Sequence, residues 1–363
     1  MAVNNPKHLK IILAIALKDI VQSIKDRMIL GVIIGILFLI LPSQLLPIIL
    51  QNENTPLAVI SGREPTALAN ALTNLPDTNA FTVKSLPDLQ DEIASRTGNI
   101  IGLVLPEDFS VKVSSKENIN IQAYLTHWTE SDDTAMLINH FENKIQLLTD
   151  SPVEITIVDD QIHPDEGTRG SQVMFILQLV FAVLTTGLIL VPYLMMVEKE
   201  THTMDVLLVS PASLTDLIIG KSLVGVFYSV IAVMLVMLFN YKIVAHWPLL
   251  ILSILSGMTF AVLTGLLIGL TFDNFQQATL GMSIVILIAT APAFIKLILT
   301  VSLPQVLDTI VTWLPGGQLA KLLFMSLMRS VDLQSAVLGL CAIWIANFIL
   351  IGLTQSQIRR QMK

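Results

Sequence analysis

The residues best placed for chemistry lie between positions 198 and 221, where charged side chains separate two long apolar runs. Glu198, Lys199 and Glu200 open this segment, and Gly220-Lys221 closes it. Gly-Lys-Ser at 220–222 resembles the end of a phosphate-binding loop, but that motif requires another glycine five residues before Gly220, where Thr215 stands. The segment is therefore expected to bind no nucleotide, and its charges suit the docking of a partner.

The interior of the segment carries helix signals. Ser210-Pro211 breaks the chain, because proline disfavours helix for the residue before it. Ser213 with Asp216 three residues later predicts a capping box at the start of a new helix. Apolar residues supply one face: Met204, Leu207, Leu208, Leu214, Leu217 and Ile218. Two interpretations stay open, a docking surface or a membrane-surface helix that merely seats the loop.

No pattern in the chain points to catalysis or to a metal. The sequence has no His-Glu-x-x-His, no Gly-x-Ser-x-Gly and no pair of aspartates within an apolar run. His127, His140 and His163 are too scattered for a ligand set. We therefore expect no catalytic residue, no metal site and no cofactor bound by this chain.

The composition is that of an integral membrane protein. Of 363 residues, 53% are apolar and only 13% are charged, against roughly a quarter charged in soluble domains. Runs of about 20 apolar residues are long enough to cross a bilayer as helices. The sequence predicts an α-helical polytopic membrane protein with six transmembrane helices, at about 28–50, 173–197, 222–240, 248–271, 279–301 and 334–354.

Residues 51–171 form a separate acidic region. They carry a net charge of −12, whereas the rest of the chain carries +5. Short apolar runs alternate with helix patterns, which predicts an α/β domain with a partly parallel sheet. The expected strands are 56–60, 80–85, 99–105, 119–126 and 153–158, and the expected helices are 66–75, 86–95 and 132–148. A basic patch suited to nucleic acid is absent from the sequence.

Lysine and arginine set the expected orientation. Basic residues flank the first span on its amino-terminal side, and Arg359, Arg360 and Lys363 end the chain. Both termini are therefore predicted to be cytoplasmic and residues 51–171 extracytoplasmic, in an inner (plasma) membrane protein. Residues 1–27 are predicted to include an interfacial helix along the cytoplasmic leaflet, with one apolar face and lysines on the opposite face.

The segment 198–221 resembles the signature of type-2 ABC transporter permeases. The matching positions are Glu198, Glu200, Thr203, Leu207, Leu208, Ser210 and Pro211, with Gly220 and Lys221 beyond them. The chain departs at His202, where the family usually has glycine. The similarity extends to the order of amphipathic helix, first span, large outer domain and five further spans (172–363), and to residues 100–109 within the outer domain.

This resemblance implies a permease subunit of an ATP-driven exporter. Two permease subunits would pair, as a homodimer or with a paralogous permease, and each would rest on a cytosolic ABC ATPase that carries the ATP and Mg. The loop 198–221 would couple the two proteins, with Glu198 and Glu200 pairing with basic groups or helix N-termini of the ATPase. Membrane lipid is the remaining expected partner.

Two further features are expected on the outer side. Residues 302–333 contain too many breaks for a span, and Trp313 with Pro315-Gly316-Gly317 predicts short re-entrant helices. Lys296, late in the fifth span, is a candidate for the substrate pathway, although it is close enough to the surface to reach water. The competing function is a membrane-anchored receptor or scaffold without transport activity, and the cargo stays open.

Overall fold

The computed structural model divides the chain into two compact units, one largely helical and one built on a sheet. It describes residues 6–23, 26, 30–32, 34–35, 37–38, 56–62, 65–96, 99–158, 161–164, 171–201, 213–298 and 304–361.

The sheet of the second unit has five strands in the order β2-β1-β3-β4-β5. All neighbouring strands run parallel except β3 and β4, which are antiparallel. This arrangement is the partly parallel sheet expected from the sequence. The strands are β1 (Leu57–Ser61), β2 (Asn79–Thr82), β3 (Ile100–Val104), β4 (Ile119–Tyr124) and β5 (Val153–Ile157).

Helices accompany the strands at the predicted positions. They are α3 (Pro65–Thr73), α4 (Leu86–Ala94) and α6 (Ser131–Thr149). Leu72, Leu89 and Phe141 are fully buried in the cores that these helices form with the sheet. A further short helix, α5 (Phe109–Ser115), was not predicted. No residue of α5 is buried, and only Phe109 and Val113, four positions apart, pack against the core of the sheet.

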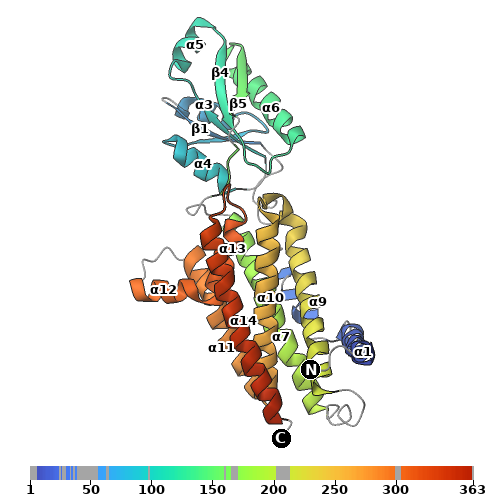
Figure 1. Ribbon diagram of the computed structural model, residues 1–363. Helices are drawn as coiled ribbons and strands as arrows, with labels where there is room; N and C mark the ends of the chain where they lie inside the picture. Colours follow the sequence, from blue (N-terminus) through green and yellow to red (C-terminus); the bar gives the residue numbers. More distant parts are fainter. Residues whose placement is uncertain are drawn as a thin grey trace. The chain divides into compact units, whose positions relative to one another are not determined.

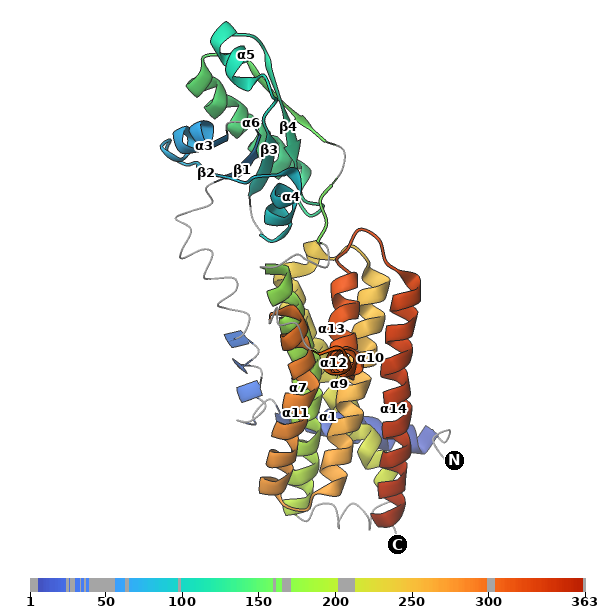
Figure 2. The same ribbon diagram turned by 90° about the vertical axis from the view of Figure 1, so that its left-hand side faces the viewer.

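The helical unit contains five helices long and apolar enough to cross a membrane, counted over the described residues. They are α7 (Ser171–Glu200), α9 (Leu214–Asn240), α10 (Trp247–Thr271), α11 (Phe275–Leu297) and α14 (Leu333–Gln361). Figures 1 and 2 show them side by side with roughly aligned axes. Each coincides with a predicted span. The other expected span, 28–50, falls mostly outside the described residues, of which 30–32, 34–35 and 37–38 are helical.

Small residues bring α7 and α10 into close contact. A Cβ atom at Gly265 would lie 2.6 Å from the backbone oxygen of Gly187, and one at Gly187 would lie 2.8 Å from the Cβ of Ala261. No larger side chain fits without moving a backbone. The glycines in these spans therefore allow the helices to pack closely, as expected for membrane helices.

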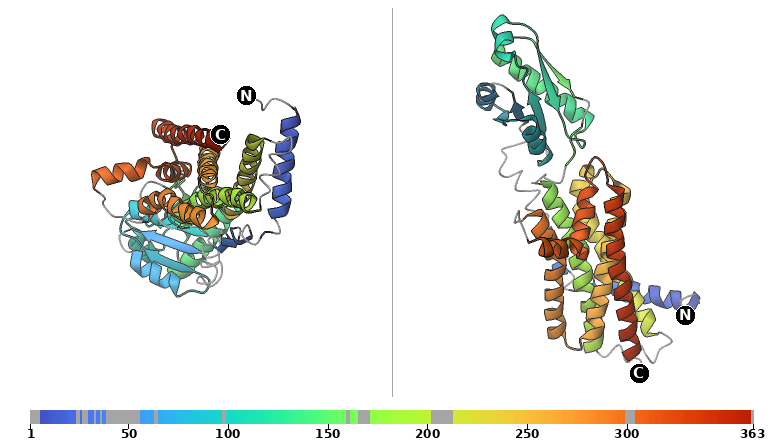
Figure 3. Two further views of the ribbon diagram at one scale, coloured as in Figure 1. Left: turned by 90° about the horizontal axis from the view of Figure 1, so that it is seen from below. Right: turned by 60° about the vertical axis from the view of Figure 1, so that its left-hand side comes forward.

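Residues 304–325 form two short helices of different character. In α12 (Gln305–Trp313) no residue is buried, and Val306, Ile310 and Trp313 are exposed. In contrast, α13 (Pro315–Met325) is buried from Gly316 to Met325 except at Lys321. Figures 1 and 3 show α12 projecting away from the long helices. Two short helices thus lie where the sequence predicts them in place of a span, and their re-entrant position on the outer side stays a prediction.

Helix α1 (Pro6–Ser23) corrects the expectation of one apolar face. Ile12, Ile15 and Ala16 are buried against the helical unit, whereas Leu9, Leu13, Leu17 and Val21 are more than half exposed. Figure 2 shows α1 lying across the direction of the long helices. The apolar residues divide into two faces because α1 packs on protein along one side, which spacing alone does not reveal. The exposed leucine face is the one that suits a membrane surface.

Candidate functional site

The ammonium group of Lys221 lies in a buried ionic cluster that joins three helices. Its Nζ is 2.7 Å from Oδ2 of Asp19 in α1 and 2.9 Å from Oε1 of Glu198 in α7. The exposed fractions of the Lys221, Asp19 and Glu198 residues are 1%, 4% and 6%. Lys221 itself lies in the second turn of α9. We call Asp19, Glu198 and Lys221 the ionic cluster.

A second cation reaches the ionic cluster from α1. Nζ of Lys18 lies 3.9 Å from Oε1 of Glu198, and the Lys18 side chain is 59% exposed. Among the described residues, two carboxylates therefore face two ammonium groups. The pairing matters because a buried charge without a partner costs far more than a paired one.

The start of α9 is fixed by a second polar group. Ser213 Oγ accepts a hydrogen bond from the Asp216 backbone N–H at 3.2 Å, and Asp216 Oδ2 accepts one from the Ser213 N–H at 3.0 Å. This is the capping box predicted from the sequence. Nδ1 of His8 in α1 lies 2.9 Å from the same Asp216 oxygen. Helix α1 is therefore joined to the first turn of α9 as well as to Lys221.

Apolar contact between the same helices surrounds these polar links. A Cβ atom at Gly220 would lie 2.9 Å from Cγ2 of Ile15, so the glycine lets α1 pack directly on α9. Ile15 belongs to a buried cluster with Leu214, Leu217 and Ile218 of α9. Figure 3 shows α1 and α9 as neighbours when seen along the bundle. The contacts of α1 with α9 thus run from Asp216 to Tyr228.

Two aromatic hydroxyl groups add links to the amino-terminal region. Tyr193 of α7 donates a hydrogen bond to Oδ2 of Asp26 at 2.6 Å, and Tyr228 of α9 donates one to the Ile20 carbonyl at 3.3 Å. The amino-terminal segment is therefore attached to both helices that flank the connection 202–212.

The structure separates the two acidic residues of the sequence signature. Glu198 is buried and paired within the chain, whereas Glu200 is exposed at the last position of α7. Between them, Lys199 donates to the Phe272 carbonyl at 2.7 Å and lies 3.2 Å from Asp273. Glu200 is thus presented to the surface, and its neighbours hold the end of α7 in place.

Five other signature residues lie outside the described residues: Thr203, Leu207, Leu208, Ser210 and Pro211. Gly220 and Lys221 are described, and both face α1. The structure therefore brings Glu198, Gly220 and Lys221 together and places Glu200 apart from them. Their assignment to an ATPase contact stays a prediction.

Lys296 lies far along the chain from this group, in the last turn of α11. Its Nζ pairs with Oδ1 of Asp308 in α12, and the two side chains are 32% and 48% exposed. The charge of Lys296 thus has a partner at the surface of the helical unit. Its role in a substrate pathway stays a prediction.

Asp19 and His8 were missed as functional candidates. Asp19 is an acidic residue in a basic helix, and it shares the face of Ile12, Ile15 and Ala16. That position was a usable signal, because an acidic group on a buried face requires a cation from another element. The pairing partner could not be read from spacing, since Asp19 and Lys221 are about 200 positions apart.

The charged groups of this site pair with one another within the chain. Among the described residues, no group of three His, Cys, Asp or Glu side chains is placed to hold a metal ion. The ionic cluster is closed to water by its burial. The ionic cluster connects the carboxyl-terminal end of α7 and the amino-terminal part of α9 to helix α1.

Comparison with known proteins agrees with this architecture. The family described as "ABC-2 family transporter protein" matches residues 28–354, which is most of the chain. No curated protein matches the chain. The matched range includes most of each of the five described membrane-crossing helices. The chain therefore belongs to the ABC-2 family and is a multi-pass permease of the type-2 ABC transporters.

Proposed function

We propose that this chain is the permease subunit of an ATP-driven exporter, driven by separate cytosolic ATPase subunits that contact residues 198–221. Family membership supports a transport subunit. In this proposal the ATP and Mg belong to the ATPase. Two permease chains, identical or paralogous, form the pathway between them.

The ionic cluster is the observation that carries the proposal. The connection 202–212 is flanked by Glu198 on one side and by Lys221 on the other, and Lys221 pairs with both Glu198 and Asp19. A displacement of this connection would therefore move α7, α9 and α1 together. Coupling further requires that the ATPase contact the connection differently in its two nucleotide states, because equal contact shifts no equilibrium.

The proposed orientation places the connection and both termini in the cytoplasm. The amino-terminal helix carries Lys10 and Lys18, and α14 ends with Arg359 and Arg360. Basic residues next to spans favour the cytoplasmic side. With residues 28–50 as a first span, six spans result and residues 51–171 are extracytoplasmic.

Copurification with measurement of ATP hydrolysis tests the proposal. We expect an ABC ATPase to copurify with the chain and to show vanadate-sensitive turnover.

Glu200→Lys should abolish export while the protein remains folded and inserted, because Glu200 is exposed and its replacement costs within about 1 kcal/mol of stability. Lys199→Gln also changes a charge at the end of α7, but it removes a hydrogen bond to the Phe272 carbonyl. It therefore does not separate a partner contact from a contact within the chain. Gln276→Lys, at an exposed position in the first turn of α11, introduces a lysine elsewhere in the helical unit, with a charge change of +1 against +2 for Glu200→Lys.

Two outcomes would contradict the proposal. A chain that is stable and functional with no ATPase partner would favour the receptor or scaffold. Unchanged export in Glu200→Lys, with Gln276→Lys as the comparison, would remove the coupling role from this carboxylate.

A further inference from the structure

An open, shallow hollow of about 300 Å³ lies along the carboxyl-terminal turns of α14. Five residues line it: Gly352, Gln355, Ser356, Arg359 and Arg360. All five are exposed. The volume is at the lower end of the range for small-molecule sites, and four of the five residues carry hydrogen-bond donors in their side chains.

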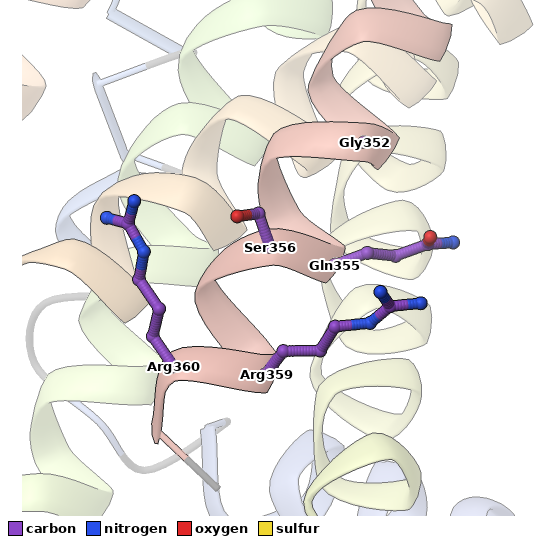
Figure 4. Close-up of a pocket in the computed structure, with 5 residues that line it drawn as sticks. All are labelled: Gly352, Gln355, Ser356, Arg359 and Arg360. Carbon is purple, nitrogen blue, oxygen red and sulfur yellow. The ribbon is translucent and has the colours of Figure 1, made fainter. Parts of the chain in front are cut away.

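The donors of this hollow have no partners among the described residues. No carboxylate there lies within ion-pair distance of Arg359 or Arg360, and Gln355 and Ser356 make no side-chain hydrogen bond. Figure 4 shows Ser356 and Arg360 extending along one flank of α14, and Gln355 and Arg359 along the other. Each flank thus pairs a guanidinium with a neutral donor one helical turn away. Guanidinium groups are the side chains best matched to phosphate oxygens.

An apolar surface continues directly from the hollow. On the same exposed side of α14, the residues one to four turns earlier are Ile345, Phe348, Ile349 and Leu353, which are between 48% and 66% exposed. Phe348 lies 11 residues before Arg359, about 16 Å along a helix that rises 1.5 Å per residue. Half of a bilayer hydrocarbon core is about 15 Å. With Arg359 at the headgroup level, the apolar stretch therefore spans one leaflet.

Gly352 lies between the polar hollow and the apolar surface of α14. A Cβ atom there would meet nothing within 4 Å. The glycine lies where the apolar side chains give way to the polar ones, so a molecule with a polar head and an apolar tail can lie against the helix without obstruction.

We infer that α14 carries a binding site for an anionic phospholipid of the cytoplasmic leaflet. Arg359, Arg360, Ser356 and Gln355 hold the phosphate headgroup, and the acyl chains lie along Phe348 and Ile349. The inference uses the orientation given under the proposed function, in which this end of α14 is cytoplasmic. Anionic lipid is concentrated in that leaflet, and basic residues at its surface attract it.

Titration of the purified full chain with short-chain lipids tests the inference. Native mass spectrometry counts the bound molecules of dioctanoyl-phosphatidylglycerol and of dioctanoyl-phosphatidylcholine. We expect one saturable phosphatidylglycerol, with phosphatidylcholine at least tenfold weaker. Arg359→Gln with Arg360→Gln should weaken phosphatidylglycerol at least tenfold, because each basic residue near an anionic surface contributes about a five-fold factor.

Two further variants separate this site from general effects of charge. Lys10→Gln with Lys321→Gln removes the same charge from exposed positions elsewhere and should leave binding unchanged. Gly352→Leu adds a side chain whose Cβ atom would meet nothing within 4 Å in the chain, and it should weaken binding while retaining both arginines. Leucine also favours helix over glycine, so loss of folding cannot account for the result.

The inference is overturned by any of three results. Equal binding in the double arginine variant or in Gly352→Leu would show that the hollow holds no lipid. Competition by inorganic phosphate as strong as that by phosphatidylglycerol would show a free-anion site. A change from dimer to monomer with unaltered lipid binding would identify the surface as a contact between copies. None of these readouts depends on transport or ATP hydrolysis, so failure here leaves the proposed function standing.

Discussion

Lys221 and Glu198 are 23 positions apart in the chain, and their side chains bond at 2.9 Å in a site from which water is excluded. The residues between them include the connection 202–212, so this bond joins the helices that precede and follow the connection. Asp19 completes the arrangement from α1, at 2.7 Å from the same ammonium group. The connection is therefore anchored to a rigid junction of three helices.

Replacing Lys221 by methionine should destabilise the protein strongly. Lys221→Met leaves the buried carboxylates of Asp19 and Glu198 facing each other without their shared cation. Breaking a buried ion pair by removing one partner costs about 3–5 kcal/mol. We expect a clear fall in the apparent unfolding midpoint, measured in detergent at a fixed scan rate.

The matched control for Lys221→Met removes the carboxylate charges as well. The variant with Lys221→Met, Asp19→Asn and Glu198→Gln leaves no charge on the three residues of the ionic cluster, so it should recover part of the lost stability. A triple variant less stable than Lys221→Met alone would contradict the ionic account of this cluster.

Enlarging Gly220 should separate α1 from α9. In Gly220→Leu, the new side chain would occupy the position of Ile15, whose Cγ2 lies only 2.9 Å from the point where a Cβ atom at Gly220 would be. We expect reduced export, and ATP hydrolysis no longer stimulated by cargo, because α1 no longer moves with α9. Export by reconstituted vesicles together with phosphate release measures both quantities.

A second change distinguishes a specific clash from general damage in this variant. Ile15→Ala removes the atoms that the leucine would meet, so Gly220→Leu with Ile15→Ala should regain export. The account fails if Ile15→Ala does not improve Gly220→Leu while both variants fold and insert.

The pair of Lys296 and Asp308 tests the substrate pathway. Lys296→Met and Asp308→Asn break the same exposed ion pair, which contributes at most about 1 kcal/mol. Only the first variant removes a cation that cargo would contact. Because Lys296 is already paired with Asp308, we expect its charge to have no further role in cargo binding. The two variants should therefore export equally. Export lost in Lys296→Met and retained in Asp308→Asn would instead establish Lys296 as a cargo contact.

The sheet unit should lose stability in mild acid through His140. Burial, and then the charge of Lys144, lower the pKa of His140 below its ordinary value of 6.5. The unfolded chain therefore binds this proton more readily than the folded one, and stability falls as pH drops through 6.5 toward the folded pKa. Nε2 of His140 also lies 3.2 Å from Thr78 Oγ1. Hydrogen exchange of α6 amides at pH 7 and pH 5.5, compared between the wild type and His140→Gln, measures this effect. An identical pH response in the two proteins would contradict it.

Much of the fold could be predicted because long elements leave strong patterns. The five described spans and the strands of the sheet each coincide with an apolar run, and Ser213 with Asp216 marked a helix start by a purely local interaction. Helix α5 has only seven residues, and its one core-facing apolar pair, Phe109 and Val113, is too short a pattern to predict a helix.

The contacts of the functional region were less accessible to sequence reasoning. Gly220 and Lys221 were selected by resemblance, but their contact with Ile15 and Asp19 depends on how α1 packs. Both faces of α1 carry apolar residues, and periodicity does not tell an apolar face that packs on protein from one that stays exposed. Glu198 and Glu200 likewise have the same residue type but different exposure, which is set by tertiary packing.

The side of the membrane at which Glu200 lies tests the central claim most directly. A single cysteine at Glu200, in a Cys341→Ala background, can be labelled with a maleimide that does not cross membranes. We predict labelling in inside-out vesicles and none in intact cells, with protection when the ATPase is bound. Labelling of Glu200→Cys from outside intact cells would contradict the claim that a cytosolic motor drives this permease through residues 198–221.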